Sequence, residues 1–376
     1  MSEIKVNSIK GVGASAAAIT VNNSDGTCSA KLTDNGGLQF ANRNKIINGE
    51  FRVNQRNHTG SAGHNAYTLD RWKYARSANT EFSTSQSTDT PDGFANSVKL
   101  DCIGANGSTG SADYAYFRYH IEGQDLQELN KGTSAAKVAT LSFYVKCDIT
   151  GTFAINVVDE NSRMCNLTYT VSNTNWNRYI VTIPADTSGA LANNNSTQLS
   201  IHFYIIAGSN ITSGGSLNSW GAYNSGHLAQ GHTANIVSTD HNWYMTGVQL
   251  EISDYATPFE HRTYAQELAL CQRYFYRLAG DDTTIATGHQ NGAYGIFPIR
   301  YPQEMRAQPT GTAQTVTDAY SYYYEGSVAR VNSVNLAAHN NRHGNLESTS
   351  YNTSNGTVGL FRITNSSAYI DISADL

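Results

Sequence analysis

Alternating apolar and polar positions run through most of this sequence and predict β-strands. Clear examples are Tyr114–His120, Ala139–Lys146 and Leu199–Ile206, and turns rich in Gly and Asn separate such runs. Many short strands with turns between them are typical of two antiparallel sheets packed face to face. We therefore predict a mainly β fold, with a jelly-roll-like β-sandwich at residues 45–256.

A helical period occurs in one long stretch and predicts a joining helix over residues 257–279. Thr257 is the expected N-cap, Pro258 the first helical residue, and Glu260 lies three positions after the cap. One helix stripe, expected to form an oligomer contact or joint, holds Tyr264, Leu268, Cys271, Phe275 and Leu278. This spacing suits a coiled-coil seam, and it equally suits a helix lying on its own sandwich.

Two further regions flank these elements. Residues 1–44 alternate in short runs around a turn signal at Asn22–Gly26, which predicts an N-terminal arm containing a hairpin. So short a piece cannot bury its own apolar side, so we expect the arm to pair with partner subunits or to dock on its own domain. Residues 280–376 return to strand-like alternation and predict a smaller C-terminal β domain.

Composition limits the classes of function. The net charge is −5 and only 15 % of residues are charged, which gives no electrostatic case for binding nucleic acid or an anionic membrane surface. No apolar run approaches the ~20 residues of a membrane-spanning helix, so no membrane insertion is expected. The five cysteines are widely spaced without a C-x-x-C motif, which favours buried thiols made in a reducing cytoplasm.

No motif for catalysis or cofactor binding emerges from the sequence. A Gly-x-Ser-x-Gly nucleophile elbow is absent. On a helix, His339 and His343 could bind one metal, but their segment, HNNRHGN, is a poor helix former. Carboxylate pairs such as Asp125 with Glu128 are more simply explained as capping and loop charges. We therefore expect no catalytic residues, no metal and no cofactor.

Aromatic residues provide the candidate chemistry, because sugar rings stack on Trp and Tyr while nearby polar groups bind the hydroxyls. Trp72, Trp176 and Trp243 lie within strand-like patterns and are expected in the core. Five others, in the polar segment 207–239 or in one tyrosine-rich run, are the glycan-binding candidates: Trp220, Tyr223, Tyr322, Tyr323 and Tyr324. A subunit interface remains the alternative for the tyrosine-rich run, since interfaces are also rich in aromatic residues.

Four motifs stand out along the chain: TGVQLE at 246–251, ATPFEHR at 256–262, ELALCQRYFYRL at 267–278, and a tyrosine, Tyr67, shortly before Asp70-Arg71-Trp72. They resemble the lectin-like, carbohydrate-binding-like β-sandwich module of bacteriophage tail fibres and related virion proteins. The first residues, SEIKVNSIKG at 2–11, and the last, YIDISADL at 369–376, also resemble phage fibre proteins. Residues 319–331 and 337–355 contain no motif that resembles this family.

This resemblance implies a virion structural protein: a homotrimeric tail fibre, made in the bacterial host cytoplasm, that contacts a bacterial surface glycan or receptor during host attachment. The arm would bind other virion proteins at the tail or an adaptor, through Ile4, Val6, Ile9, Ile19 and Val21. Two alternatives stay open. One is a decoration, collar or whisker subunit without a receptor role. The other is a surface-polysaccharide depolymerase, against which the lack of a fixed-period repeat counts.

Overall fold

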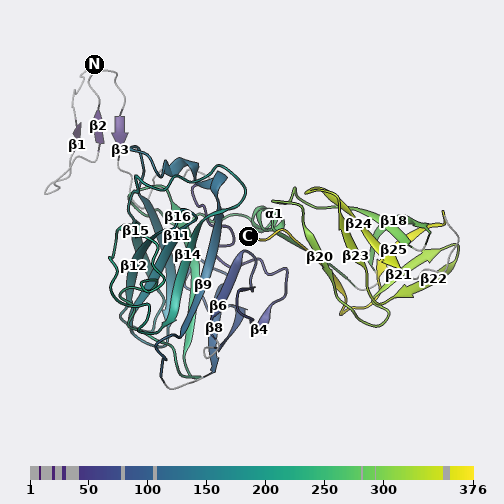
Figure 1. Cartoon of the computed structure of the whole chain (residues 1–376), viewed down its shortest axis with the longest axis horizontal. Coiled ribbons are helices and arrows are strands. Elements are labelled where there is room, and N and C mark those ends of the chain that lie inside the picture. Colours follow the sequence, from purple (N-terminus) through teal and green to yellow (C-terminus); the bar gives the residue numbers. More distant parts are fainter. Residues whose placement is uncertain are drawn as a thin grey trace, which may run out of the picture.

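The computed structural model describes residues 8–9, 19–21, 28–30, 42–77, 81–104, 108–280, 283–292, 294–349 and 356–376. Figure 1 shows a large β body, a smaller β body beyond it, and the helix α1 between them. A three-stranded sheet formed by β1 (Ser8–Ile9), β2 (Ile19–Val21) and β3 (Cys28–Ala30) lies near the N-terminus. Within the described ranges, no helix is long and apolar enough to cross a membrane.

The large body is a sandwich of two antiparallel sheets. The six-stranded sheet has the order β13 (Asn177–Ile183), β10 (Ala139–Cys147), β16 (Asn242–Glu251), β8 (Ser97–Gly104), β7 (Glu81–Ser87), β4 (Thr59–Ser61). The seven-stranded sheet has the order β15 (Trp220–Ala222), β12 (Arg163–Val171), β11 (Gly151–Asp159), β14 (Thr197–Ala207), β9 (Tyr114–Glu122), β6 (Trp72–Arg76), β5 (Ala66–Tyr67). A short 3-10 helix, Gly123–Leu129, follows β9.

Aromatic side chains fill the space between the two sheets. The Trp72 and Phe117 rings stack with centroids 5.1 Å apart and planes 2° from parallel. The Trp243 indole N–H donates to the Tyr169 hydroxyl over 3.1 Å, which satisfies the two polar groups within the apolar core. The predicted mainly β, sandwich-type fold class is confirmed by this arrangement.

The smaller body has its own apolar core, which includes Phe297, Tyr320 and Phe361. Its three-stranded sheet has the order β17 (Phe275–Ala279), β26 (Tyr369–Ser373), β20 (Thr310–Ala313). Its seven-stranded sheet has the order β22 (Ser327–Val331), β21 (Tyr320–Tyr324), β25 (Val358–Ile363), β18 (Thr283–Asn291), β19 (Tyr294–Arg300), β24 (His343–Thr349), β23 (Asn335–Ala338).

The joining helix is shorter than predicted, and its expected cap at Thr257 is wrong. Helix α1 spans Tyr264–Gln272, and its N-cap is Thr263, which forms a capping box with Gln266. The Thr257 hydroxyl instead donates to the Glu251 carboxylate. The capping box of Thr263 and Gln266 lies directly before the amphipathic residues. Upstream, the backbone N–H groups of Thr257 and Glu260 donate to side chains of β16, which holds residues 257–260 in a non-helical conformation.

The predicted helix stripe is therefore broken. Phe275 and Leu278 belong to strand β17, which pairs with β26. The backbone N–H and C=O groups after α1 find their hydrogen-bond partners in β26 and so leave the helical conformation. Within α1, Cys271 is fully buried, Leu268 is half-buried and Tyr264 is 49 % exposed, so these three do not form one buried seam. The short helix packs on the sandwich, where its buried Glu267 carboxylate accepts the Asn48 backbone N–H.

A buried charged network ties α1 and the start of β17 to the sandwich. The Glu122 carboxylate, at the end of β9, accepts hydrogen bonds from Arg273 at 2.8 and 3.0 Å and from the Tyr274 hydroxyl. The buried Arg71 guanidinium lies 3.5 Å from the centroid of the Tyr274 ring. These contacts combine opposite charges with a cation–π interaction at the junction of the two bodies.

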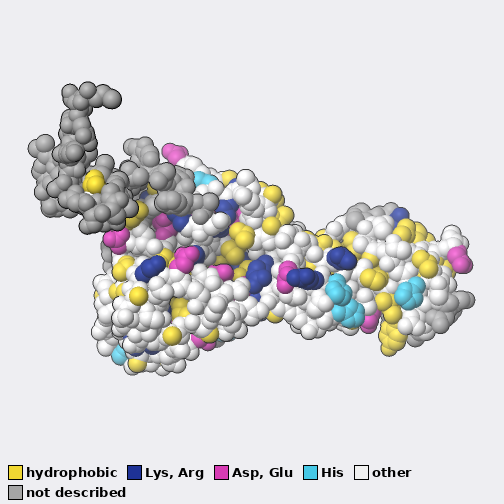
Figure 2. All heavy atoms as spheres, turned by 90° about the horizontal axis from the view of Figure 1, so that it is seen from above, with side chains coloured by type: hydrophobic (Ala, Val, Ile, Leu, Met, Phe, Trp, Pro, Cys, Tyr) yellow, Lys and Arg dark blue, Asp and Glu magenta, His cyan; other side chains and the backbone are white. Residues whose placement is uncertain are grey.

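The C-terminal segment adds a second connection. Arg56 of the sandwich pairs with Asp375, and the Lys73 ammonium donates to the Leu376 carbonyl over 2.8 Å. Arg306 of the smaller body donates to the Asn195 carbonyl over 3.0 Å. Figure 2 shows Lys/Arg and Asp/Glu side chains gathered along the narrow connection between the bodies. The two bodies are therefore joined by several polar contacts in addition to the helix.

The arm prediction is tested only in part by the described residues. Ile9 is opposite Ile19 in the β1–β2 pair, and Val21 is opposite Cys28 in the β2–β3 pair, as a hairpin around the predicted turn requires. Ile4 and Val6 lie outside the described residues.

Four cysteines, Cys102, Cys147, Cys165 and Cys271, are free and buried, as the sequence predicted. Burial raises the pKa of both Cys147 and Cys165 to about 12, so both thiols remain protonated near neutral pH.

Replacing Glu122 with Gln removes the negative charge of the junction network. We expect Glu122→Gln to lower the free energy of unfolding of the sandwich by about 2–3 kcal/mol, less than for a fully buried pair because Arg273 is partly exposed. All four tryptophans lie in the sandwich region, so urea unfolding followed by Trp fluorescence measures this body. The control is Glu128→Gln, which breaks a pair of the sandwich between Lys45 and an exposed carboxylate and should cost under ~1 kcal/mol. Equal losses in both variants would contradict a structural role for the network.

Candidate functional site

The outward face of the seven-stranded sheet carries aromatic and cationic side chains. On β9, Ala115, Phe117 and Tyr119 are buried toward the core, so the alternating positions Tyr114, Tyr116, Arg118 and His120 point to the opposite side. Figure 1 shows β9 beside β14 and β6 in this sheet. One strand thus builds the core on one side and this face on the other.

Strand register brings residues from four strands into one row. Arg118 is directly opposite Lys73 of β6 and His202 of β14, and His202 is opposite Asn156 of β11. Residues paired in this way have side chains close together on the same face of the sheet. We call this surface the aromatic face and define it by Lys73, Tyr114, Tyr116, Arg118, His120, His202 and Tyr223. Asn156 and Tyr204 point to the same side of the sheet but are fully buried beneath it.

Ring contacts organise the aromatic face around Tyr116. Its ring stacks on His202 with centroids 4.7 Å apart and planes 11° from parallel, and on Tyr114 with centroids 5.7 Å apart. Tyr204 lies 5.0 Å from it in a tilted arrangement. Tyr114 and Tyr116 are half-buried, so part of each ring remains open to solvent. Packing of this kind restricts the rotamers and gives a preformed surface.

Of the five predicted glycan-binding residues, Tyr223 lies at the aromatic face. Its side chain is 45 % exposed, and its backbone N–H donates to the Ser162 carbonyl over 2.7 Å. Burial is the main cause of the raised pKa of Tyr116, and the neighbouring hydroxyls of Tyr114 and Tyr223 raise it further. Tyr223 therefore reaches across the sheet toward the tyrosines of β9 and β14.

Several polar atoms of the aromatic face lack a protein partner. One Arg118 nitrogen, Nη2, donates to the Asn65 side-chain oxygen over 2.9 Å, but its buried Nε makes no such bond. The same holds for His202 Nδ1 and for the Asn156 side-chain oxygen. Buried polar atoms are normally hydrogen-bonded, but each of these three atoms is enclosed by protein, so none is open to a ligand at the surface.

Burial shifts the pKa of the titratable groups on the aromatic face. Burial, and to a smaller extent the neighbouring Arg118, lower the pKa of His202 to about 3 and that of His120 to about 2. Burial and Arg118 also lower the pKa of Lys73 to about 8. At neutral pH both histidines are uncharged and able to donate or accept, while Lys73 and Arg118 carry positive charge.

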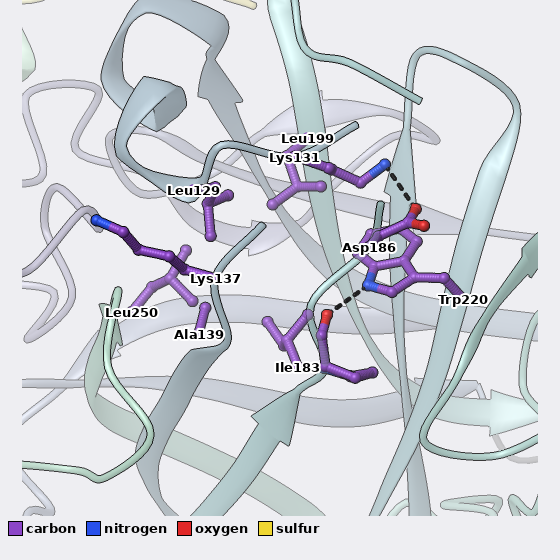
Figure 3. Close-up of a pocket in the computed structure, with 10 residues that line it drawn as sticks. Leu129, Lys131, Lys137, Ala139, Ile183, Asp186, Leu199, Trp220 and Leu250 are labelled. Atoms are coloured by element: carbon purple, nitrogen blue, oxygen red, sulfur yellow. Dashed lines mark hydrogen bonds and ion pairs between the residues drawn. The ribbon is translucent and has the colours of Figure 1, made fainter. Parts of the chain in front are cut away.

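Trp220, predicted as a glycan-binding residue, is half-buried at the edge of the sandwich and stays a candidate. Figure 3 shows Trp220 lining a pocket with Lys131, Asp186 and Ile183. Its indole N–H donates to the Pro184 carbonyl over 2.8 Å, and the Lys131 ammonium lies 4.5 Å from its ring centroid. Because β15 pairs with the edge of β12, the ring turns inward and closes the edge of the sandwich.

The tyrosine-rich run of the smaller body is divided between core and surface. Tyr322 is fully buried, so its prediction as a glycan-binding residue is wrong; the strands on both sides of β21 enclose its ring. Tyr323 and Tyr324 are half-buried, and the Arg362 guanidinium lies 4.3 Å from the Tyr323 ring centroid. These two tyrosines stay candidates for contact with a ligand or another subunit.

The described residues bring together no cluster of metal ligands. The rings of His339 and His343 have centroids 5.7 Å apart beside the β23–β24 turn, yet the described ranges bring no three His, Cys, Asp or Glu together as metal ligands. Asp159 and Asp186 both bind the Lys131 ammonium and are buried, which makes them a structural pair.

Sequence reasoning missed most of the aromatic face although one signal for it was present. The run Tyr114–His120 alternates between residues that pack in cores and residues such as Tyr, Arg and His, which tolerate water at one end. Reading both halves of that alternation would have selected Tyr114, Tyr116 and Arg118. His202 and Asn156 carry no comparable signal, because only strand pairing brings them beside Arg118.

No protein-family model and no curated protein matches this sequence. Among solved structures, the chain is similar to the enzymatically active domain of tailspike protein 4 of bacteriophage CBA120, with 12 % identity and a TM-score of 0.31. That match covers 56 % of this chain and 22 % of the tailspike chain, so the comparison spans about a fifth of that protein.

The chain is also similar to a putative sugar binding protein from Bacteroides thetaiotaomicron, with 12 % identity, a TM-score of 0.31 and coverage of 56 % of this chain and 100 % of that one. A family 11 carbohydrate-binding module from Clostridium thermocellum, in complex with a mixed-linked tetrasaccharide, matches with 12 % identity and a TM-score of 0.27. That match covers 54 % of this chain and 98 % of the module.

The lowered pKa of His202 predicts acid sensitivity of the sandwich. A histidine kept neutral in the folded state takes up a proton on unfolding below its ordinary pKa of about 6.5, so stability present above that pH is lost as the pH falls toward 4. We expect His202→Gln to lose less stability than the wild type between pH 7 and pH 5, measured by urea unfolding. The exposed His64 is the control, and His64→Gln should keep the wild-type dependence. If the free energy of unfolding falls equally with pH in the wild type and in His202→Gln, the acid sensitivity does not come from His202.

Proposed function

We propose that this protein is a non-catalytic virion fibre that contacts a glycan on the bacterial surface through the aromatic face. The observation that carries the glycan part is the stacked pair of half-buried Tyr114 and Tyr116 rings on the outward side of the sheet, with Tyr223 and Arg118 beside them. Sugars bind such surfaces because their C–H faces stack on aromatic rings while hydroxyl groups exchange hydrogen bonds with nearby side chains.

Each part of the aromatic face has a role in this proposal. The open parts of the Tyr114 and Tyr116 rings provide the stacking surface. Tyr223, from the polar segment 207–239, adds a further ring beside them. Arg118 and His202 are half-buried, lie opposite each other on adjacent strands and place polar side chains beside these rings. Because the strands are rigid, little ordering accompanies binding, which favours affinity.

The fibre part of the proposal rests on the sequence motifs that resemble phage tail fibres. In this proposal the N-terminal arm attaches the fibre to other virion proteins, and the protein is located in the virion as a homotrimer. The two β bodies, joined by the Glu122 network and the C-terminal segment, extend toward the cell surface. The lack of an open carboxylate pair on the aromatic face favours binding without hydrolysis, which requires two such groups.

Replacing Tyr116 tests the glycan proposal directly. We expect Tyr116→Ala in the full chain to weaken binding to the glycans or host cells that the wild type recognises by about tenfold, because the central ring of the stack is lost. Glycan-array and cell-binding measurements provide the readout. The control is Tyr255→Ala, which removes a tyrosine that is 55 % exposed after β16 and should leave binding unchanged.

The proposal fails if the wild type binds no bacterial glycan or cell, and that result would favour the decoration, collar or whisker alternative. Release of new reducing ends from a bound polysaccharide would instead favour the depolymerase alternative.

Assembly supplies a separate test of the fibre proposal. Light scattering should give three times the chain mass of 40.8 kDa. Two apolar side chains of α1, Tyr264 and Leu270, are 49 % and 36 % exposed, so Leu270→Asp should lower the assembled mass if α1 contributes to the trimer contact. Leu217→Asp, at a leucine that is 39 % exposed in the sandwich, is the matched control. A monomeric wild type would contradict the trimer.

A further inference from the structure

The outward side of the six-stranded sheet carries a second group of aromatic side chains. On β10, Phe143 and Val145 are buried in the core, so Tyr144 between them points outward. The ring centroid of Phe94 lies 5.2 Å from that of Tyr144 and 5.2 Å from that of Phe259. All three of these rings are half-buried, so each keeps some surface open to solvent.

The three rings line an open cleft of about 390 Å³. This volume falls within the range of about 300–1,000 Å³ that is usual for ligand pockets. The cleft is also lined by Asp92, Arg178, Pro258 and His261. It therefore combines apolar ring surface with charged and polar groups.

Two of the sequence motifs meet at this cleft. Gly247 of TGVQLE has a φ of +61°, and a Cβ at this position would lie 2.7 Å from the Phe94 ring and 2.9 Å from the Tyr144 ring. The missing side chain therefore lets both rings lie against the backbone of β16. Phe259 and His261 come from ATPFEHR, and their ring centroids lie 4.9 Å apart. Because the rings pack on one another and on the strand, the cleft is preformed.

Polar groups with open surface border the rings. The Nη2 atom of Arg178 donates to the Ser142 hydroxyl and to the Thr257 carbonyl. Its Nε and Nη1 atoms have no hydrogen-bond partner among the described residues, and they are not enclosed by protein. Asp92 is exposed, and the His261 side chain is 48 % exposed. Arg178 thus offers donors to a ligand in the cleft, and Asp92 offers acceptors.

A further ring extends this surface along the sheet. Tyr244 of β16 is opposite Lys146, which lies two residues after Tyr144 on the outward side of β10, roughly 7 Å along the strand. Trp176, expected in the core, is instead half-buried on this outward side, and its ring centroid lies 6.2 Å from that of Tyr244. Its indole N–H donates to Asp89 over 2.9 Å, which draws the ring out of the core and fixes its orientation.

The charged groups beside these rings balance one another. The Lys146 ammonium lies 2.6 Å from the Asp89 carboxylate and 5.4 Å from the centroid of the Tyr244 ring. Within the cleft, Arg178 and Asp92 carry opposite charges. The surface therefore suits a ligand that has no net charge but has both hydroxyl donors and acceptors.

We infer that this surface is a second glycan site, which binds a neutral oligosaccharide. We call it the β10 face and define it by Asp92, Phe94, Tyr144, Trp176, Arg178 and Phe259.

One sugar ring of the oligosaccharide occupies the cleft, where its C–H face lies against the aromatic rings and its hydroxyls bind Arg178 and Asp92. The following sugars extend along β10 toward Trp176. The β10 face belongs to the opposite sheet from the aromatic face, so it goes beyond the proposed function and binds independently of Tyr116.

The experiment measures how binding depends on the length of a neutral glycan. Linear hexasaccharides of glucose, galactose and mannose, in α and β linkage, are titrated into the full chain beside their disaccharides by isothermal titration calorimetry. At least one hexasaccharide should bind at least ~10-fold more tightly than its disaccharide, because only the longer glycan contacts both the cleft and Trp176.

Variants assign this binding to the β10 face. Trp176→Ala should bring the affinity for the hexasaccharide to within about twofold of that for the disaccharide. Phe259→Ala should weaken binding of both by about tenfold, because the cleft loses a ring. Asp92→Ala, at an exposed position that the fold does not depend on, should weaken both to a similar extent of about tenfold.

The matched control is Tyr294→Ala, which removes a tyrosine that is 50 % exposed in the smaller body and should leave binding unchanged. Thermal unfolding of each variant confirms that the fold is intact, and Asp92→Ala keeps the test decisive if Phe259→Ala does not fold.

The outcomes distinguish the β10 face from the aromatic face. If Trp176→Ala and Asp92→Ala leave binding unchanged while Tyr116→Ala weakens it, the second site is overturned and the proposed function stands. If the two β10-face variants weaken binding and Tyr116→Ala does not, the second site stands and the aromatic face loses its proposed role.

Absence of binding to every neutral hexasaccharide overturns the second site, and equal affinities for the two glycan lengths overturn the extension to Trp176. Absence of binding to bacterial cells and to an array of bacterial surface glycans as well overturns the proposed function too.

Discussion

Each strand has two faces, and the structure depends on how β9 uses both of them. Toward the core, Phe117 stacks on Trp72 and helps to hold the two sheets together. Toward the outside, Tyr116 and Arg118 form the centre of the aromatic face. Because side chains alternate along a strand, a register shift of one residue would exchange these roles and remove both the core and the face.

The same strand also connects the aromatic face to the second body. Glu122 ends β9 and binds Arg273 and Tyr274 where α1 passes into β17. Lys73, beside Arg118 in the sheet, binds the carbonyl of Leu376. The aromatic face therefore lies next to the junction, and Lys73 takes part in both.

The candidate site was only partly predictable. Tyr223 was selected because it is an aromatic residue in a polar segment, and the structure places it near the tyrosines of the seven-stranded sheet. Trp220, three residues earlier, was selected by the same argument but turns inward to cover Lys131. The two residues share a local sequence context, so only the pairing of β15 with β12 separates their roles.

The sequence by itself determined the strands, the division into β regions and the presence of a helix between the two larger β regions, because these follow from local periodicity and turn residues. The end of that helix at Gln272, the burial of Tyr322 and the row through Arg118, His202 and Asn156 were decided by the tertiary structure. These features depend on hydrogen-bond partners far apart in the chain, and a local pattern does not encode which strands will pair.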